Sequence, residues 1–149
     1  MRAVVQRVSE AKIIVDERAV ATISRGLLVY LGVHRDDQKS DADYLADKIV
    51  GLRVFEDSQG KMNLDLAQVG GELLVVSQFT LYGDCRRGKR PSFDAAASLV
   101  DANSLYEYFV EKCRGCQVPA KTGIFREMMH VFSINDGPVT VLLDSKKVF

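Results

Sequence analysis

The stretch Ser77-Gln78-Phe79-Thr80-Leu81 is the part of the chain best suited to chemistry, because it places two hydroxyls and an amide at the end of an apolar run. Polar groups at the end of a buried strand often line the site of a layered α/β protein. Thr80 could act as a nucleophile, but a hydroxyl needs a base to activate it, and no His or Lys lies nearby in the sequence. The alternative is a structural strand end whose hydroxyls bond the backbone.

A second stretch, residues 135–140, reads Asn-Asp-Gly-Pro-Val-Thr and has the composition of a turn. Glycine takes backbone angles closed to other residues, proline fixes its own φ, and Asn and Asp bond their local backbone. Apolar alternating runs flank it at 129–134 and 139–143. The structural interpretation is a hairpin turn. The functional one is a rigid surface, poor in side chains, that presents backbone carbonyls to a ligand.

Two further clusters carry reactive or charged groups. Cys113-Arg114-Gly115-Cys116 is a CxxC pair, but it falls at the predicted end of a helix, where the dipole disfavours a thiolate. A structural zinc would need two more ligands, and Cys85, His34 and His130 are scattered. Arg86-Arg87-Gly88-Lys89-Arg90 places four cations in five residues. Such a run is either a solvated loop or a set of phosphate contacts on RNA.

The length of 149 residues indicates one domain spanning residues 1–149, and a composition of 47% hydrophobic and 27% charged residues is typical of a soluble globular protein with a core. Twenty Lys and Arg balance twenty Asp and Glu, so any contact with RNA must be local rather than driven by net charge. No apolar run reaches the roughly 18 residues of a membrane span. The early charges exclude a secretory signal, and three cysteines argue against a disulfide framework. We therefore expect a cytoplasmic protein.

Apolar patterning predicts many strands and two main helices. Residues 26–33 form a continuous apolar run, typical of a strand buried on both faces. One helix is predicted from Ser40 or Asp41 to about Gly51, and a second from an N-cap at Asp101 to about Gly115. Because the apolar strands need cover on both faces, we expect a mixed α/β domain of packed, partly barrel-like β-sheets with a helical layer. The other predicted strands cover residues 3–8, 11–15, 19–23, 53–55 and 72–81.

Together, residues 77–81 and 135–140 resemble the paired signature of the D-aminoacyl-tRNA deacylases. Both motifs, in this order and at this spacing in a chain of this length, are highly specific. The resemblance runs along the whole chain. It also includes Val5-Gln6-Arg7-Val8, Gly26-Leu27-Leu28-Val29, Gly60-Lys61-Met62-Asn63-Leu64, Gly70-Gly71-Glu72-Leu73-Leu74-Val75-Val76 and Arg90-Pro91-Ser92-Phe93.

The resemblance implies a hydrolase that cleaves the ester between a D-amino acid and the terminal adenosine of tRNA, without a metal or another cofactor. Glycyl-tRNA mischarged on tRNA(Ala) is a second expected substrate. The resemblance also implies a homodimer with its site at the subunit interface. In that dimer a cis Gly137-Pro138 peptide of one subunit enters the pocket of the other.

The implied enantiomer filter has a physical basis. L-amino acids share a stereocentre but not a side chain, so a rigid backbone wall can reject them all where one side chain could not. Fixed carbonyls of Gly137 and Pro138 would hold the substrate ammonium, and their bulk would clash with an L side chain. Glycine has no side chain to reject. Asn135, Val139 and Thr140 belong to the same motif.

Ser77, Gln78, Phe79 and Thr80 match the catalytic motif of the family. In one hypothesis Thr80 is the nucleophile. In the other, the neighbouring ribose hydroxyl of the tRNA activates water, and backbone amides around Phe79 and Thr80 polarise the ester carbonyl as an oxyanion hole. We favour the second, because the sequence offers no base next to Thr80.

Three other positions match residues that support the site in the family. Arg7 is expected to brace the Gly-Pro turn, and Phe125 and Met129 are expected near the terminal adenosine or the mouth of the pocket. Arg126 and Glu127 depart from the family pattern, which has small residues there. These two residues affect the expected adenosine contacts more than the expected rejection of L-amino acids by Gly137 and Pro138.

Two rival functions remain open on the sequence alone. One is a non-catalytic RNA-binding module that works through Arg86 to Arg90. The other is a small-molecule hydrolase that uses Thr80 or Cys85.

Overall fold

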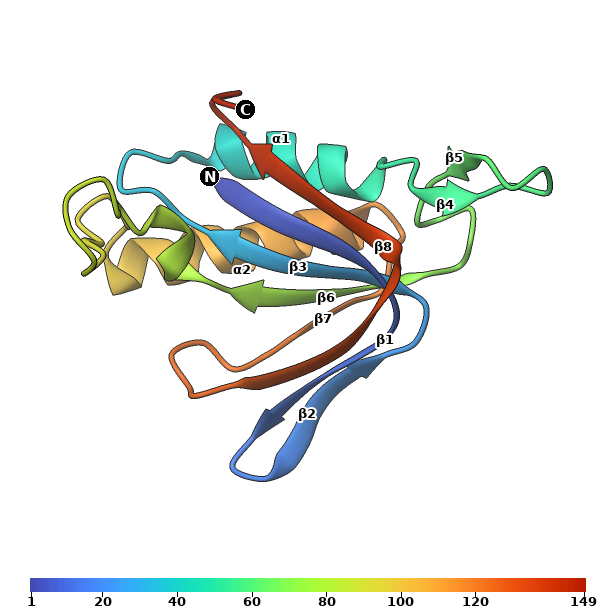
Figure 1. Cartoon of the computed structure of the whole chain (residues 1–149), viewed down its shortest axis with the longest axis horizontal. Coiled ribbons are helices and arrows are strands. Elements are labelled where there is room, and N and C mark those ends of the chain that lie inside the picture. The colour runs from blue at the N-terminus through green and yellow to red at the C-terminus, as the bar shows by residue number, and fades with distance from the viewer.

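A curved sheet with two helices on one side forms the body of the protein (Figure 1). The computed structural model describes residues 1–149. Six strands pair in the order β2–β1–β3–β6–β7, with β8 paired to β1 outside this path. They are β1 (Arg2–Val15), β2 (Arg18–Ile23), β3 (Gly26–Gly32), β6 (Glu72–Ser77), β7 (Ala120–Thr122) and β8 (His130–Asp144). The helices are α1 (Lys39–Val50) and α2 (Leu99–Gly115), with one 3-10 turn, η1 (Phe79–Tyr82), and a small hairpin of β4 (Phe55–Glu56) and β5 (Met62–Leu64).

Strand β1 organises the sheet because it has three partners. Its first half pairs antiparallel with β3, its second half pairs with β2, and β8 follows nearly its whole length. The predicted strands at 3–8 and 11–15 are therefore two halves of one long strand. This sharing curls the sheet toward a barrel, and the predicted mixed α/β fold with partly barrel-like sheets and a helical layer is confirmed.

The strands β3 and β6 are buried on both faces, as the apolar runs predicted. Alternate side chains point to opposite faces of a strand. Leu27 and Leu73 therefore belong to the larger core beneath the helices, whereas Leu28 and Leu74 belong to a smaller core against the curled half of β1, β2 and β8. The end of β6 is thus held firmly between two packed layers.

Three predicted boundaries are wrong for local reasons. Helix α1 begins at Lys39, after an N-cap at Gln38 instead of the predicted Ser40 or Asp41, because the Asp41 carboxylate accepts the Gln38 N–H at 2.8 Å from inside the first turn. Helix α2 is capped by Ser98, whose hydroxyl accepts the Asp101 N–H at 3.2 Å. Strand β6 stops at Ser77 instead of continuing to residue 81.

The predicted hairpin at residues 135–140 is also wrong. The apolar runs on either side both belong to β8, and both pair antiparallel with β1. Because they pair with the same strand in the same direction, the chain does not reverse between them.

The two ends of the described chain lie close together on α1 (Figure 1). The buried amino group of Met1 donates to Asp37 at 2.6 Å and to the Ser145 hydroxyl at 2.6 Å. Asp41 accepts the Ser145 hydroxyl at 2.7 Å and pairs with Lys146 at 2.7 Å. Burial alone would raise the pKa of Asp41, but hydrogen bonds from Lys146 and Ser145 outweigh it and lower that pKa to about 2. Neither helix combines the length and apolarity that a membrane crossing needs.

Candidate active site

A mostly apolar cavity of about 700 Å³ opens where β6 ends. Its size falls in the range of small-ligand sites, which are mainly hydrophobic with a few placed polar groups. Of the residues expected in the site, it brings together Ser77, Gln78, Phe79, Phe125 and Met129. The other lining residues are Val76, Phe93, Ala96, Ala97, Leu99, Ala102, Arg126, Glu127, Met128 and Val131.

The turn after β6 leaves two backbone donors free. The Gln78 N–H still donates to the Leu31 carbonyl at 2.8 Å, as a last rung of the sheet. The chain then enters η1, where the Leu81 N–H donates back to the Gln78 carbonyl at 3.3 Å. The N–H groups of Phe79 and Thr80 have no acceptor within the chain, which is the normal state of the first residues of a helical turn. Both are therefore available to polarise a carbonyl oxygen.

The Thr80 hydroxyl has no base to activate it. The Gln78 side-chain amide donates to the Thr80 hydroxyl oxygen, and an amide N–H cannot take a proton from it. His34 lies in a different cavity, where its ring packs 5.1 Å from that of Tyr82. The ring nitrogen Nδ1 of His34 accepts the Asp36 N–H at 3.1 Å. The geometry therefore disfavours Thr80 as a nucleophile.

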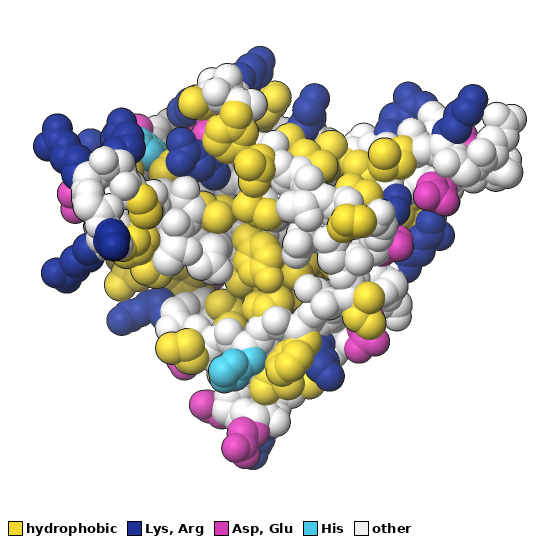
Figure 2. All heavy atoms as spheres, viewed as in Figure 1, with side chains coloured by type: hydrophobic (Ala, Val, Ile, Leu, Met, Phe, Trp, Pro, Cys, Tyr) yellow, Lys and Arg dark blue, Asp and Glu magenta, His cyan; other side chains and the backbone are white.

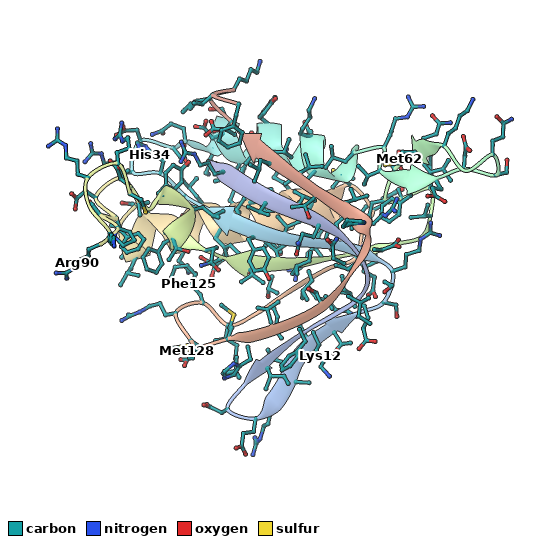
Figure 3. The ribbon with its side chains drawn as sticks, in the orientation of Figure 1. Lys12, His34, Met62, Arg90, Phe125 and Met128 are labelled. Atoms are coloured by element: carbon teal, nitrogen blue, oxygen red, sulfur yellow. The ribbon has the colours of Figure 1, made fainter.

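Aromatic rings form two sides of the cavity. Phe79 meets Phe93 edge to face, with 5.0 Å between ring centroids. Phe125 packs 6.1 Å from Tyr106, whose hydroxyl donates to the buried Val75 carbonyl at 2.8 Å. Burial raises the pKa of Tyr106 well above its ordinary value, so the phenol stays a neutral donor. The labelled Phe125 and Met128 lie on the same side of the molecule, below the η1 region (Figure 3).

Several residues that line the cavity were not identified from the sequence. Ala96, Ala97, Leu99 and Ala102 come from the approach to α2 and its first turn, and no local pattern marks them as lining residues. Phe93 carried a signal, since it ends one of the segments that resemble the family. Arg126, a departure from the family pattern, lines the cavity with a backbone φ of 70°.

The second motif bulges out of β8 opposite Arg7. Gln6 pairs with Thr140 and Val8 with Asn135, so the segment 136–139 faces a single residue of β1. Inside the bulge, the Asn135 side-chain amide donates to the Arg7 carbonyl at 2.9 Å and to the Val139 carbonyl at 3.1 Å.

The guanidinium of Arg7 lies against this bulge. The Arg7 Nε atom donates to the Asp136 carbonyl at 3.2 Å and lies 3.1 Å from the Asp136 carboxylate. Nη1 donates to the Val54 carbonyl. Arg7 is only 6% exposed, so one buried cation joins the bulge to the segment leading into β4.

The expected cis peptide is not present. No peptide bond of the chain is cis, so Gly137–Pro138 is trans, the form that X-Pro bonds favour by about 0.5–1 kcal/mol. The chain instead bends through Gly137, whose φ of +108° suits a glycine. Gly137 and Pro138 are exposed, and neither lines the cavity of its own chain. Within one chain the second motif therefore forms no part of this cavity.

The cysteines show no reactive arrangement. Cys113 is fully buried in α2, and burial raises the pKa of its thiol to about 12. Cys116 donates to the Lys112 carbonyl at 3.4 Å, and Cys85 is exposed on the loop after η1. No group of three or more His, Cys, Asp or Glu side chains is placed to hold a metal ion.

The fold and cavity define a small α/β protein that can hold an apolar, nucleoside-sized group beside the free amide of Phe79, with the free amide of Thr80 next in the chain. Comparison with known proteins then gives the family. The D-Tyr-tRNA(Tyr) deacylase family matches residues 4–144. The chain is 62% identical to the D-aminoacyl-tRNA deacylase of Thermotoga petrophila and 61% identical to that of Koribacter versatilis, each over 100% of both chains. The chain therefore belongs to the D-aminoacyl-tRNA deacylase family, a family of hydrolases, and the resemblance found in the sequence is confirmed.

Two solved structures share the fold. One, named c-Myc DNA Unwinding Element Binding Protein, is 37% identical, with a TM-score of 0.91 over 97% of this chain and 98% of that one. The other, a probable eukaryotic D-amino acid tRNA deacylase, is 17% identical, with a TM-score of 0.79 over 96% of this chain and 98% of that one.

Proposed function

We propose that this chain, acting as a single domain of residues 1–149 in the cytoplasm, hydrolyses the ester bond of D-aminoacyl-tRNA and releases free tRNA and the D-amino acid. The observation that carries the proposal is the unpartnered N–H group of Phe79, which lines an apolar cavity, followed in the chain by the unpartnered N–H group of Thr80, which lies outside the lining. Such donors stabilise the oxyanion that forms when an ester carbonyl is attacked. Family membership supplies the substrate class.

The terminal adenosine would occupy the cavity, with its base against the rings of Phe79 and Phe125 and against Met129. The ester carbonyl then lies against the free amides, with Ser77 and Gln78 at the floor. The ribose hydroxyl next to the ester positions a water molecule. The water oxygen attacks the carbonyl carbon, the bond to the ribose oxygen breaks, and the ribose oxygen takes the proton. Removal of one oxyanion donor costs about 2.7–4 kcal/mol in a related type of site, so two donors supply a large part of such catalysis.

The filter against L-amino acids comes from the bulge of a second subunit. Gly137 and Pro138 are exposed on β8, and the same strand exposes Phe132 at 53%, Ile134 at 59% and Leu142 at 57%. A row of exposed large apolar side chains is typical of a surface that another chain covers. In the homodimer, this strand brings the bulge of each subunit to the cavity of its partner.

The bulge is built to be rigid. Its backbone is held by Arg7 and by the Asn135 amide, and Pro138 has no free φ. Val139 and Thr140 return the chain to the ladder with β1. Rigid carbonyls of Gly137 and Pro138 would hold the substrate ammonium and leave no room for an L side chain. Glycyl-tRNA mischarged on tRNA(Ala) passes the same filter because glycine has no side chain.

The direct test compares D-Tyr-tRNA with L-Tyr-tRNA at equal concentration. We expect release of D-tyrosine, survival of the L ester, and the same rates with and without chelator. Equal hydrolysis of both isomers would refute the proposed filter against L-amino acids. Tight tRNA binding without turnover would favour the RNA-binding module instead, and loss of all activity in Cys85→Ala would favour the thiol hydrolase.

A further inference from the structure

The loop between η1 and α2 carries a charged cluster that the proposed chemistry does not use. We call residues 85–91 the basic loop. It contains Arg86, Arg87, Lys89 and Arg90, all exposed. Figure 2 shows Lys and Arg side chains gathered at this end of the molecule, on the left of the view. The chain as a whole has zero net charge, so this corner holds a local excess of positive charge.

The base of the basic loop is fixed. Asp84 and Ser92 exchange backbone hydrogen bonds of 2.7 and 3.0 Å across it. The Asp84 carboxylate binds the Arg86 guanidinium through two contacts, at 2.9 and 2.6 Å. Hydrogen bonds from Arg86 lower the pKa of Asp84 to about 2, so this ion pair persists at neutral pH. The Arg86 side chain therefore stabilises the base of the loop.

The other three cations are left without a carboxylate. Arg87, Lys89 and Arg90 take part in none of the ion pairs of the chain, in contrast to Arg86. Arg90 extends from the loop into solvent (Figure 3). Next to Lys89, Gly88 has a φ of +80° with open space around it, so the tip is not packed against the body. Three uncompensated charges on an anchored tip are suited to bind a polyanion.

The basic loop ends beside the cavity at the end of β6, whereas its first residues, Cys85 and Arg86, line the separate cavity that contains His34. Phe93, two residues after the last residue of the loop, lines the cavity at the end of β6 and packs on Phe79. Arg90 lies three positions before Phe93 along the chain, and Arg87 lies three positions after Asp84. A chain spans at most about 3.3–3.6 Å per residue, so each of these cations lies within about 11 Å of the fixed base. The end of the loop therefore lies close enough to the cavity to reach a group attached to a ligand bound there.

We propose that Arg87, Lys89 and Arg90 of the basic loop bind the phosphates that precede the terminal adenosine, and so dock the 3′ end of tRNA on the site. This inference rests on the proposed function and names the surface that receives the RNA. Phosphate contacts fix register without reading sequence. Such docking suits an enzyme that must accept many tRNAs and check only the amino acid.

The test uses a loop variant with Arg87→Gln, Lys89→Gln and Arg90→Gln. The control variant carries Arg18→Gln, Lys48→Gln and Lys61→Gln, three exposed cations elsewhere that also lack ion-pair partners. Both variants change the net charge equally. We would measure kcat/KM at 50 and 200 mM salt on D-Tyr-tRNA and on 3′-D-tyrosyl-adenosine, which has no phosphates.

Each phosphate contact contributes about 0.7–0.9 to the slope of log affinity against log salt. Loss of three contacts lowers that slope by about 2 to 3. The wild-type protein should therefore lose roughly 20- to 40-fold more affinity for tRNA than the loop variant when salt rises from 50 to 200 mM. We expect this effect on KM for tRNA, with kcat retained. The adenosine substrate should react alike with all three proteins, and the control should behave as wild type.

A loop variant with the wild-type salt slope on tRNA would overturn the proposal. So would an equal loss of affinity for duplex DNA, because the loop would then be a general polyanion surface. If the wild-type protein hydrolyses neither substrate, the proposed function fails. The salt dependence of binding to uncharged tRNA then tests separately whether the basic loop binds phosphates. A reduced salt slope of binding would then support the docking role, and an unchanged slope would refute it.

Discussion

Replacement of Gly137 by Ala tests whether the bulge of β8 depends on close contact with Arg7. A Cβ atom added at Gly137 would lie only 2.3 Å from Arg7 Nη2 and 3.2 Å from Val139 Cγ2. The guanidinium cannot move freely, because it is buried and donates to the Val54 and Asp136 carbonyls. The substitution must therefore displace Arg7 from at least one acceptor.

The expected cost has two parts. An alanine at a φ of +108° costs on the order of 1–3 kcal/mol. Loss of one hydrogen bond from a charged group adds about 1.5–3 kcal/mol. Gly60→Ala is the matched control, since Gly60 also has a positive φ, of +73°, but nothing lies within 4 Å of its added Cβ. The difference between the two variants isolates the displacement of Arg7, about 1.5–3 kcal/mol, or about 3–12 °C in Tm.

The assay combines thermal unfolding with hydrolysis of D-Tyr-tRNA and L-Tyr-tRNA. We expect Gly137→Ala to melt below Gly60→Ala and to lose at least about tenfold in its preference for the D ester, which corresponds to about 1.4 kcal/mol. The reasoning is refuted if Gly137→Ala and Gly60→Ala share one Tm and both keep the wild-type preference.

Three other predictions concern the reaction and the stability of the fold. Thr80→Ala should retain substantial activity in single-turnover assays; a thousandfold fall, about 4 kcal/mol, would restore Thr80 as the nucleophile. Substrates ending in 2′-deoxyadenosine should react poorly, and normal turnover of them would exclude the ribose hydroxyl from the mechanism. Asp41 has a folded pKa of about 2, below its ordinary value of 3.8, so its contribution is complete above about pH 4 and lost as pH falls toward 2. Asp41→Asn should therefore lower stability by about 1–2 kcal/mol at pH 7 and flatten the acid limb of an unfolding titration, and an unchanged limb would count against this ion pair.

Much of the fold followed from local pattern. The apolar runs of β3 and β6 and the helical periodicity of α1 and α2 marked those elements, because burial on one or both faces leaves a direct trace in the sequence. The strand β6 was predicted four residues too long, to residue 81, but its start at Glu72 was correct. The boundaries failed where one hydrogen bond decided them, as at Gln38 and Ser98.

The rest depended on contacts between distant segments. Residues 135–140 have strong turn chemistry, yet pairing along the whole of β1 keeps β8 extended around them. The first turn of α2 reaches the cavity only because the helix packs behind β6. No short window of sequence contains such information. The partner subunit and the opposition of its bulge to the cavity stay predictions.

The two free amides at the start of η1 have a practical consequence for genetics. An amide N–H is common to every residue except proline, so exchange of the side chains of Phe79 or Thr80 leaves the donor in place. Saturation mutagenesis of Thr80 would then show a tolerant position at the point of greatest chemical importance, with proline as the one exception, whereas substitutions of Phe79 would also remove the ring from the cavity wall. Replacement of a single amide by an ester linkage, through chemical synthesis, would remove the donor itself.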